Sequence, residues 1–191
     1  MSHALIAGGT GMLQSATIQI ARQHRRTTLL CRHPDRFKHD VAPGVLSRSA
    51  VDFRDEDSTA QAIEAALESD GPCTTALLWL HSDAESSLRR IFAIFGEVKS
   101  NPRVVWILGS AAADPSTSLE TRIAELGASP LNLRIAILGF QREGPRSRWL
   151  THDEISAGAL KAWESEERIT LVGETRPWSD RPSIRGRDSE S

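Results

Sequence analysis

Short apolar runs alternate with longer amphipathic stretches along most of the chain. The apolar runs have the length of β-strands and cover residues 3–7, 27–31, 45–53, 75–80, 103–108, 132–138 and 169–172. The stretches with apolar residues at helical spacing cover residues 12–24, 57–68, 84–99, 117–126 and 151–163. Strands that alternate with helices in this way predict βαβ units and a parallel sheet. We therefore expect an α/β fold in which six to seven strands form one doubly wound parallel sheet with helices on both faces.

Polar residues mark where two of the helices begin. Asp57 and Ser58 can cap the helix that follows them. Thr151 and Glu154 have the spacing of a capping box, in which each side chain accepts a hydrogen bond from the backbone N–H of the other residue. These signals favour helices at both places.

The first apolar run leads directly into a glycine-rich turn. Residues 4–13 read Ala-Leu-Ile-Ala-Gly-Gly-Thr-Gly-Met-Leu, which indicates a buried strand, a tight turn and the start of a helix. This Rossmann-like arrangement holds the pyrophosphate of a dinucleotide at a helix N-terminus. The residues that we expect to contact such a cofactor here are Gly8, Gly9, Thr10, Gly11, Met12 and Leu13.

One position departs from the dinucleotide pattern. Gly8 and Gly11 take the first two glycine places, but the third, which lets the helix pack on the strand, is Gln14. Either the helix sits slightly farther from the sheet, or Ser15 and Ala16 provide the close contact. An ordinary strand–helix turn is the simpler alternative to a cofactor site.

The end of the second strand bears on the identity of the cofactor. Proteins that bind NAD usually place an acidic residue there, on the ribose 2′-hydroxyl. Here Arg32 follows the strand, and it could pair with a 2′-phosphate and stack on the adenine. We therefore expect NADP(H) in preference to NAD(H). The alternative is that Arg32 and Arg36 lie in a solvated loop.

The third strand ends in a second candidate contact. Asp52 and Phe53 could meet the adenine, the first through its side chain and the second through its backbone amide. The competing interpretation is an exposed turn formed by residues 52–55.

Composition sets limits on the class of protein. The chain has 191 residues with a net charge of −2, which argues against nucleic acid or an anionic membrane as the main partner. No apolar run reaches the ~20 residues of a membrane span, and no signal peptide is expected. Cys31 and Cys73 form no metal pattern, so we propose no metal and expect a reduced, cytoplasmic setting. We expect residues 1–178 to form the domain and the polar residues 179–191 a flexible tail.

Three motifs in this order resemble the short-chain dehydrogenase/reductase superfamily, in particular its small atypical bacterial members. They are the turn at 8–13, Trp-Leu-His-Ser at 79–82 and Arg-Trp-Leu-Thr at 148–151, and the resemblance extends to Pro182. It implies an NAD(P)-binding domain. Members often dimerise through the helices beside the fourth and fifth strands, which here would be residues 84–99 and 117–126.

The chain departs from that superfamily at the proton donor. The resemblance would imply a tyrosine followed four residues later by a lysine, but the chain contains no tyrosine. The residues four positions before its three lysines are Pro34, Phe95 and Ala157. The usual carbonyl-reductase mechanism therefore does not transfer. Ser110, at the end of the fifth strand, is the one counterpart of the superfamily's active-site residues.

Ligands of open parallel sheets bind outside the carboxyl ends of the strands. That rule places the candidate catalytic residues His81 and Ser110 and the candidate cofactor contact Gly139 at one crevice. His81 could act as an acid or orient a polar group, unless its ring only satisfies neighbouring backbone. Ser110 could bond the nicotinamide amide or a substrate oxygen, or it could cap the next segment.

The connection after the sixth strand is the expected substrate cover. Its candidate substrate-binding residues are Gln141, Arg148 and Trp149. Arg148 could bind an acidic group, and Trp149 could line an apolar pocket. Alternatively, Trp149 packs the following helix onto the core.

Two functions are consistent with these features. The first is an NADPH-dependent oxidoreductase that transfers hydride without a tyrosine acid to a conjugated acceptor, such as a flavin, a quinone or a tetrapyrrole. The second is a non-catalytic NADP-binding sensor or partner-binding protein. A scaffold that binds no nucleotide, with Gln14 blocking the approach, is a third alternative.

Overall fold

Seven parallel strands form the central sheet, in the order β3-β2-β1-β4-β5-β6-β9. A computed structural model describes residues 2–128, 131–144 and 146–183. The strands are β1 (His3–Ala7), β2 (Arg26–Cys31), β3 (Leu46–Ala50), β4 (Thr75–Leu78), β5 (Arg103–Leu108), β6 (Asn132–Leu138) and β9 (Ile169–Val172). The strand order changes direction between β1 and β4, which is where ligands bind in doubly wound sheets. The predicted fold class is confirmed.

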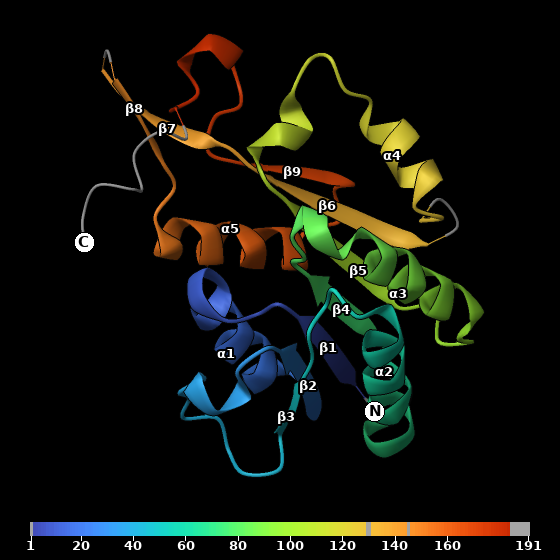
Figure 1. The fold of residues 1–191 in the computed structure, drawn as a ribbon. Coiled ribbons are helices and arrows are strands. Elements are labelled where there is room, and N and C mark those ends of the chain that lie inside the picture. The colour runs from blue at the N-terminus through green and yellow to red at the C-terminus, as the bar shows by residue number, and fades with distance from the viewer. Residues whose placement is uncertain (1, 129–130, 145, 184–191) are drawn as a thin grey trace.

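Helices cover both faces of the sheet (Figure 1). One face packs against α1 (Gln14–Gln23) and α5 (His152–Glu164). The other packs against α2 (Glu56–Asp70), α3 (Glu85–Glu97) and α4 (Leu119–Glu125). Successive side chains of a strand point to opposite faces, so the central strands supply apolar residues to both cores. In β5, for example, Trp106 joins the core under α2 and α3, and Ile107 joins the core under α1 and α5.

The two predicted helix starts have different outcomes. The capping box at α5 is confirmed: Thr151 Oγ1 accepts from the N–H of Glu154, and Glu154 accepts from the N–H of Thr151. The prediction that Asp57 and Ser58 cap α2 is wrong. Asp55 is the cap, because its carboxylate accepts from the N–H of Ser58 at 2.9 Å. The cap therefore lies two residues earlier, and Asp57 sits in the first turn.

A two-stranded antiparallel hairpin follows β6, and sequence patterning missed it. It consists of β7 (Phe140–Glu143) and β8 (Arg146–Trp149) and projects from the sheet beside α5 (Figure 1). Most of its residues are polar, so it has no apolar run to reveal it. Phe140 and Trp149 are the exceptions, and Phe140 is 1% exposed and bridges to Glu174 after β9.

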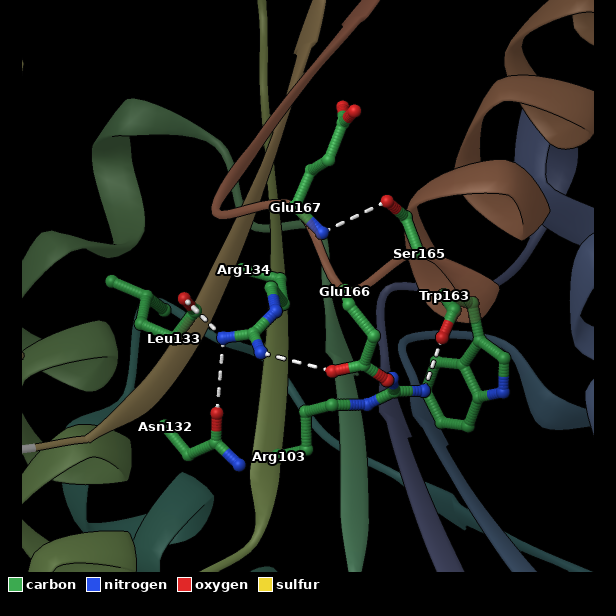
Figure 2. A network of polar contacts seen from close by, with 8 residues as sticks. All are labelled: Arg103, Asn132, Leu133, Arg134, Trp163, Ser165, Glu166 and Glu167. Atoms are coloured by element: carbon green, nitrogen blue, oxygen red, sulfur yellow. Dashed lines mark hydrogen bonds and ion pairs between the residues drawn. The ribbon is translucent and has the colours of Figure 1, made fainter.

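The connection between α5 and β9 is anchored to the starts of β5 and β6 (Figure 2). The carboxylate of Glu166 lies 3.5 Å from Arg103 and 3.3 Å from Arg134. Arg103 also donates to the carbonyl of Trp163 at the end of α5. These contacts lie at the sheet edge opposite to the strand ends described below, so they position the edge strand β9 and not the candidate site.

Two further observations concern the chain as a whole. Within the described residues, no helix is long and apolar enough to cross a membrane. Residues 179–183, which belong to the expected tail, contact the hairpin and the segment after β5. Residues 184–191 lie outside the described residues.

Candidate functional site

The residues that follow β1, β2 and β4 meet around one cleft. The three strands end in register, with Ala7 opposite both Leu30 and Leu78. The cleft has a volume of about 430 Å³, within the range of small-molecule sites. Its lining includes the predicted residues Gly8, Thr10, Gly11, Arg32, Asp52, Phe53 and His81.

Each glycine of the turn has a different physical reason to be glycine. Gly8 has φ +78°, and a Cβ there would lie 2.0 Å from the carbonyl oxygen of Trp79. A Cβ on Gly9 would lie 2.3 Å from Ile6 and 2.4 Å from Thr17. Gly9 therefore allows a close approach of α1 to β1, whereas the sequence suggests either a more distant helix or a contact through Ser15 and Ala16, and this explains how Gln14 is tolerated at the usual third glycine. Gln14 itself lines the cleft and donates to the carbonyl of Lys38.

Gly11 differs from the other two because its surroundings are open. It has φ +59°, which favours glycine, but no atom lies within 4 Å of the position of a Cβ. The backbone of Gly11 is exposed at the cleft. A phosphate can approach such a backbone closely, and the N-terminus of α1 favours negative charge.

The end of the turn is fixed from behind by α5. The Ser156 hydroxyl donates to the carbonyl of Met12 at 2.8 Å and accepts from the N–H of Ala16 at 3.4 Å. Leu13 is fully buried, and its N–H donates to the carbonyl of Thr10 at 3.3 Å. Leu13 thus supports the turn from inside the core and does not offer its N–H to a ligand in this structure.

A second wall of the cleft carries arginines, and the carboxylates Asp52 and Asp83 also line the cleft. Arg32 is exposed immediately after β2, and His33, Arg36 and Arg54 also line the wall. Arg54 is paired with Asp52, with its Nη2 2.5 Å from a carboxylate oxygen. The hydrogen bonds from Arg54 lower the pKa of Asp52 to about 2. Asp52 is therefore an anion within an exposed turn that also lines the cleft, and its contact with an adenine stays a prediction.

His81 and Trp79 form the third wall. The His81 imidazole is exposed and packs edge-on against the Trp79 ring, with 5.6 Å between ring centroids. Among the described residues, no carboxylate forms an ion pair with His81. The histidine is thus available at the cleft, but nothing holds its ring in a single tautomer.

Ser110 lies outside this cleft, in a second cluster. It begins the short helix η4 (Ser110–Ala113) after β5, and its hydroxyl accepts from Nε of Arg181 at 2.9 Å. Arg181 also lies over the rings of Trp149 and Trp178, at 5.2 and 5.0 Å from their centroids. The structure therefore brings the predicted residues Ser110 and Trp149 together through an arginine that sequence patterning assigned to the tail.

Three other predicted site residues, Arg148, Gly139 and Gln141, already make contacts within the protein. Arg148, expected to bind an acidic substrate, is held by Glu143 at 2.6 Å and by Glu154 at 2.8 Å. Gly139 is buried, its N–H donates to Val172, and a Cβ there would lie 2.0 Å from the Glu174 carbonyl oxygen. The N–H of Gly139 is therefore already used within the sheet, and a contact between Gly139 and a cofactor stays a prediction.

Gln141 pairs with Arg148 across the hairpin. It is half-buried and does not line the cleft. No group of three His, Cys, Asp or Glu side chains within the described residues could hold a metal ion.

Sequence reasoning missed several cleft residues, among them Gln14, Arg54 and Phe37. Gln14 was considered as a departure from the glycine pattern and as a possible block to a nucleotide, but not as a residue that lines the site. Phe37 is 3% exposed and reaches the cleft from the segment after η2 (Pro34–Arg36). A motif search finds residues next to the turn in sequence, but these side chains reach the cleft through separate loops.

Comparison with known proteins concerns the fold of the chain. No protein-family model and no curated protein matches the chain. A short chain dehydrogenase from Mycobacterium smegmatis is 12% identical, with TM-score 0.66 and coverage of 92% of both chains. A short chain dehydrogenase from Burkholderia cenocepacia in complex with NADP is 15% identical, with TM-score 0.63 and coverage of 91% of this chain and 88% of that one.

An NAD⁺-bound xylitol dehydrogenase is 10% identical, with TM-score 0.62 and coverage of 90% of this chain and 97% of that one. At such identities the similarity concerns architecture. The chain therefore has the fold of the short-chain dehydrogenases/reductases.

Proposed function

We propose that the chain binds NADP(H) in the cleft after β1, β2 and β4 and acts as an NADPH-dependent oxidoreductase. The observation that carries the proposal is the open backbone of Gly11 in a cleft that Arg32 and neighbouring arginines also line. Similar structures with bound NADP and NAD⁺ support a dinucleotide as the ligand class. An exposed backbone before a helix and an exposed guanidinium both suit phosphate groups, so these residues fit such a cofactor.

Different residues of the cleft would bind different parts of the cofactor. The turn from Gly8 to Gly11 would accept the pyrophosphate, since Gly11 is exposed and the turn lies before α1. Arg32 would pair with a 2′-phosphate, because a guanidinium binds phosphate through two parallel hydrogen bonds. Phe53 would contact the adenine, and Asp52 would meet its amino group while still bonded to Arg54.

NADPH, when bound, supplies the hydride, and the chain supplies orientation. The chain has no tyrosine, so a proton must come from another group. His81 is exposed at the cleft and can donate one; Ser110 stands farther along the same sheet edge and can bond an oxygen of the substrate. A conjugated acceptor delocalises the negative charge that hydride transfer creates, so a weak acid is sufficient as its proton donor.

A non-catalytic NADP-binding protein is the second candidate. One observation favours it: the hydroxyl of Ser110 is bonded to Arg181, which places a protein side chain where a substrate oxygen would bind. This candidate predicts cofactor binding without turnover for any acceptor.

The first experiment compares NADPH and NADH by calorimetric titration in the wild type and in Arg32→Ala. Loss of a charge-assisted pair removes about 1.5–3 kcal/mol, so Kd for NADPH should rise roughly 10- to 100-fold while Kd for NADH stays unchanged. Arg25→Ala is the matched control, because Arg25 is exposed before β2, at the opposite end of that strand. Equal or tighter binding of NADH by the wild type would contradict the NADP preference.

The second experiment measures NADPH oxidation against flavins, quinones and tetrapyrroles. Turnover with one of these classes is the expected result for the oxidoreductase. Tight NADPH binding with no turnover throughout the panel would favour the non-catalytic candidate.

A further inference from the structure

Arg181 is held by three elements at once. It follows η5 (Trp178–Asp180), and its guanidinium lies over Trp178 and over Trp149 of β8. Its Nε donates to Ser110 at the start of η4. Stacking on two indole rings and one directed hydrogen bond leave the planar group little freedom.

The terminal nitrogens of Arg181 are not used by the described part of the chain. No hydrogen bond or ion pair joins either Nη atom to a residue that the structure describes. Two carboxylates lie nearby, but each has other donors. Asp180 pairs with Arg142 at 3.1 Å, and Asp114 accepts from both the N–H and the hydroxyl of Ser116.

The charge of Arg181 nevertheless reaches its surroundings. The pKa of Asp114 is lowered, first by its two hydrogen bonds with Ser116 and then by the guanidinium of Arg181. Arg148 lies on β8, the strand that also carries Trp149. It differs from Arg181 because its guanidinium is already paired with two carboxylates. Arg181 therefore provides the fixed positive charge that was expected from Arg148.

Trp79 connects the cofactor cleft with the segment that precedes Ser110. Trp79 lines the cleft, and its Cη2 lies 4.0 Å from the position of a Cβ on Gly109, the residue before Ser110. Ser110 follows β5, and β5 pairs with β4, whose end forms the cleft. A substrate that extends from the cleft past Trp79 would approach Gly109 and the adjacent Ser110, whose hydroxyl is bonded to Arg181.

We propose that Arg181 recognises an anionic group, a carboxylate or a phosphate, on the small molecule that this site accepts. Both groups match the planar fork of a guanidinium, which binds them through two N–H donors. The two indole faces already restrict the fork, so little ordering cost accompanies binding. This inference rests on the proposed function, because it assumes that the substrate binds beside a cofactor in the adjoining cleft.

The test uses matched pairs of small probes with the full chain saturated with NADP⁺. Benzoate is compared with benzamide, and phenyl phosphate with phenol, by calorimetric titration. The wild type should bind at least one anion fivefold or more tightly than its neutral partner. Arg181→Met should remove that preference, because it retains an unbranched apolar stem without the charge or the fork.

Two further variants make the result specific. Arg146→Met removes an exposed arginine from β8 in the same region, and it should keep the preference. Arg181→Lys keeps the charge without the fork and should reduce the preference threefold or more. If melting curves show that Arg181→Met does not fold, Arg181→Lys alone decides the question.

Several outcomes would overturn the inference. They are equal or absent binding of anions and neutral partners by the wild type, a preference that persists in Arg181→Met, and an equal loss in Arg146→Met. The affinity for NADP⁺ is measured first and tests the proposed function by itself. A chain that does not bind NADP⁺ fails that proposal, and the same probes titrated into the free protein still test Arg181.

Discussion

At the residue scale, the turn after β1 separates two demands that a glycine can meet. Gly9 lies against Ile6 and Thr17, where any side chain would collide with the core. Gly11 faces open space but has a positive φ. Gly9 thus allows close packing of the helix on the strand, and Gly11 leaves room for a ligand at its exposed backbone.

This division predicts that two alanine substitutions both destabilise the fold but differ in their effect on NADPH binding. Gly9→Ala overpacks the α1–β1 contact and should lower the free energy of unfolding by about 1–3 kcal/mol. Gly11→Ala should lower it by about 1–2 kcal/mol and should also weaken NADPH binding, because the new methyl group points into the space for phosphate. Chemical denaturation and NADPH titration of both variants measure the two effects. Unchanged affinity in Gly11→Ala would contradict the phosphate assignment.

At the element scale, α5 links the candidate site to the hairpin. Its capping residue Glu154 binds the Thr151 N–H and the Arg148 guanidinium, so one carboxylate fixes both the helix start and β8. Farther along the helix, Ser156 bonds the turn at Met12. A change at the start of α5 should therefore reach both the phosphate turn and the substrate side.

The pH dependence of Glu154→Gln follows from its pKa. Hydrogen bonds from Arg148 and Thr151 lower the pKa of Glu154 from its usual 4.5 to about 2. A lowered pKa in the folded state stabilises the fold above pH 4.5, and this contribution is lost as the pH falls toward 2. The wild type should therefore have a higher Tm than Glu154→Gln at neutral pH, and the difference should close between pH 4.5 and 2.

Melting curves of both proteins over that range measure the effect. Asp153→Asn is the matched control, since Asp153 is exposed in the same first turn. A Tm difference that does not vary with pH would contradict an ionic role for Glu154.

At the scale of the whole molecule, the parallel sheet brings distant loops to one edge. The cleft joins residues from after β1, β2, β3 and β4. A ligand in the cleft therefore contacts several separate segments. Because it binds only when all of them are folded, it stabilises the complete domain.

Cofactor binding should consequently raise the Tm of the full chain. NADPH at 100 times its Kd contributes about 2.7 kcal/mol, which corresponds to a rise of roughly 5–10 °C for a domain of this size. Differential scanning fluorimetry with and without NADPH measures the shift, and adenosine serves as a control without phosphates. No shift with either NADPH or NADH, together with no heat of binding, would favour the scaffold that binds no nucleotide.

The local pattern of residues determined the elements and the fold class. The bounds of β1, β5, β6 and β9 and the capping box agree with the structure, because buried strands and helix caps depend on neighbouring residues. The hairpin was missed since polar residues form both strands, and the cap of α2 was misplaced since several acidic residues compete there. Strand and cap patterns are local, because they depend on residues that are close together in the sequence.

The tertiary structure determined which of the candidate site residues lie close together and which are already bonded. Gly139 and Arg148 looked available in sequence, but the chain itself fills their surroundings. Arg181 looked like part of a tail, but the fold places it between two tryptophans and against Ser110. Whether a polar group is free or already bonded depends on segments far away in sequence. Only the packed sheet and its loops bring those segments together.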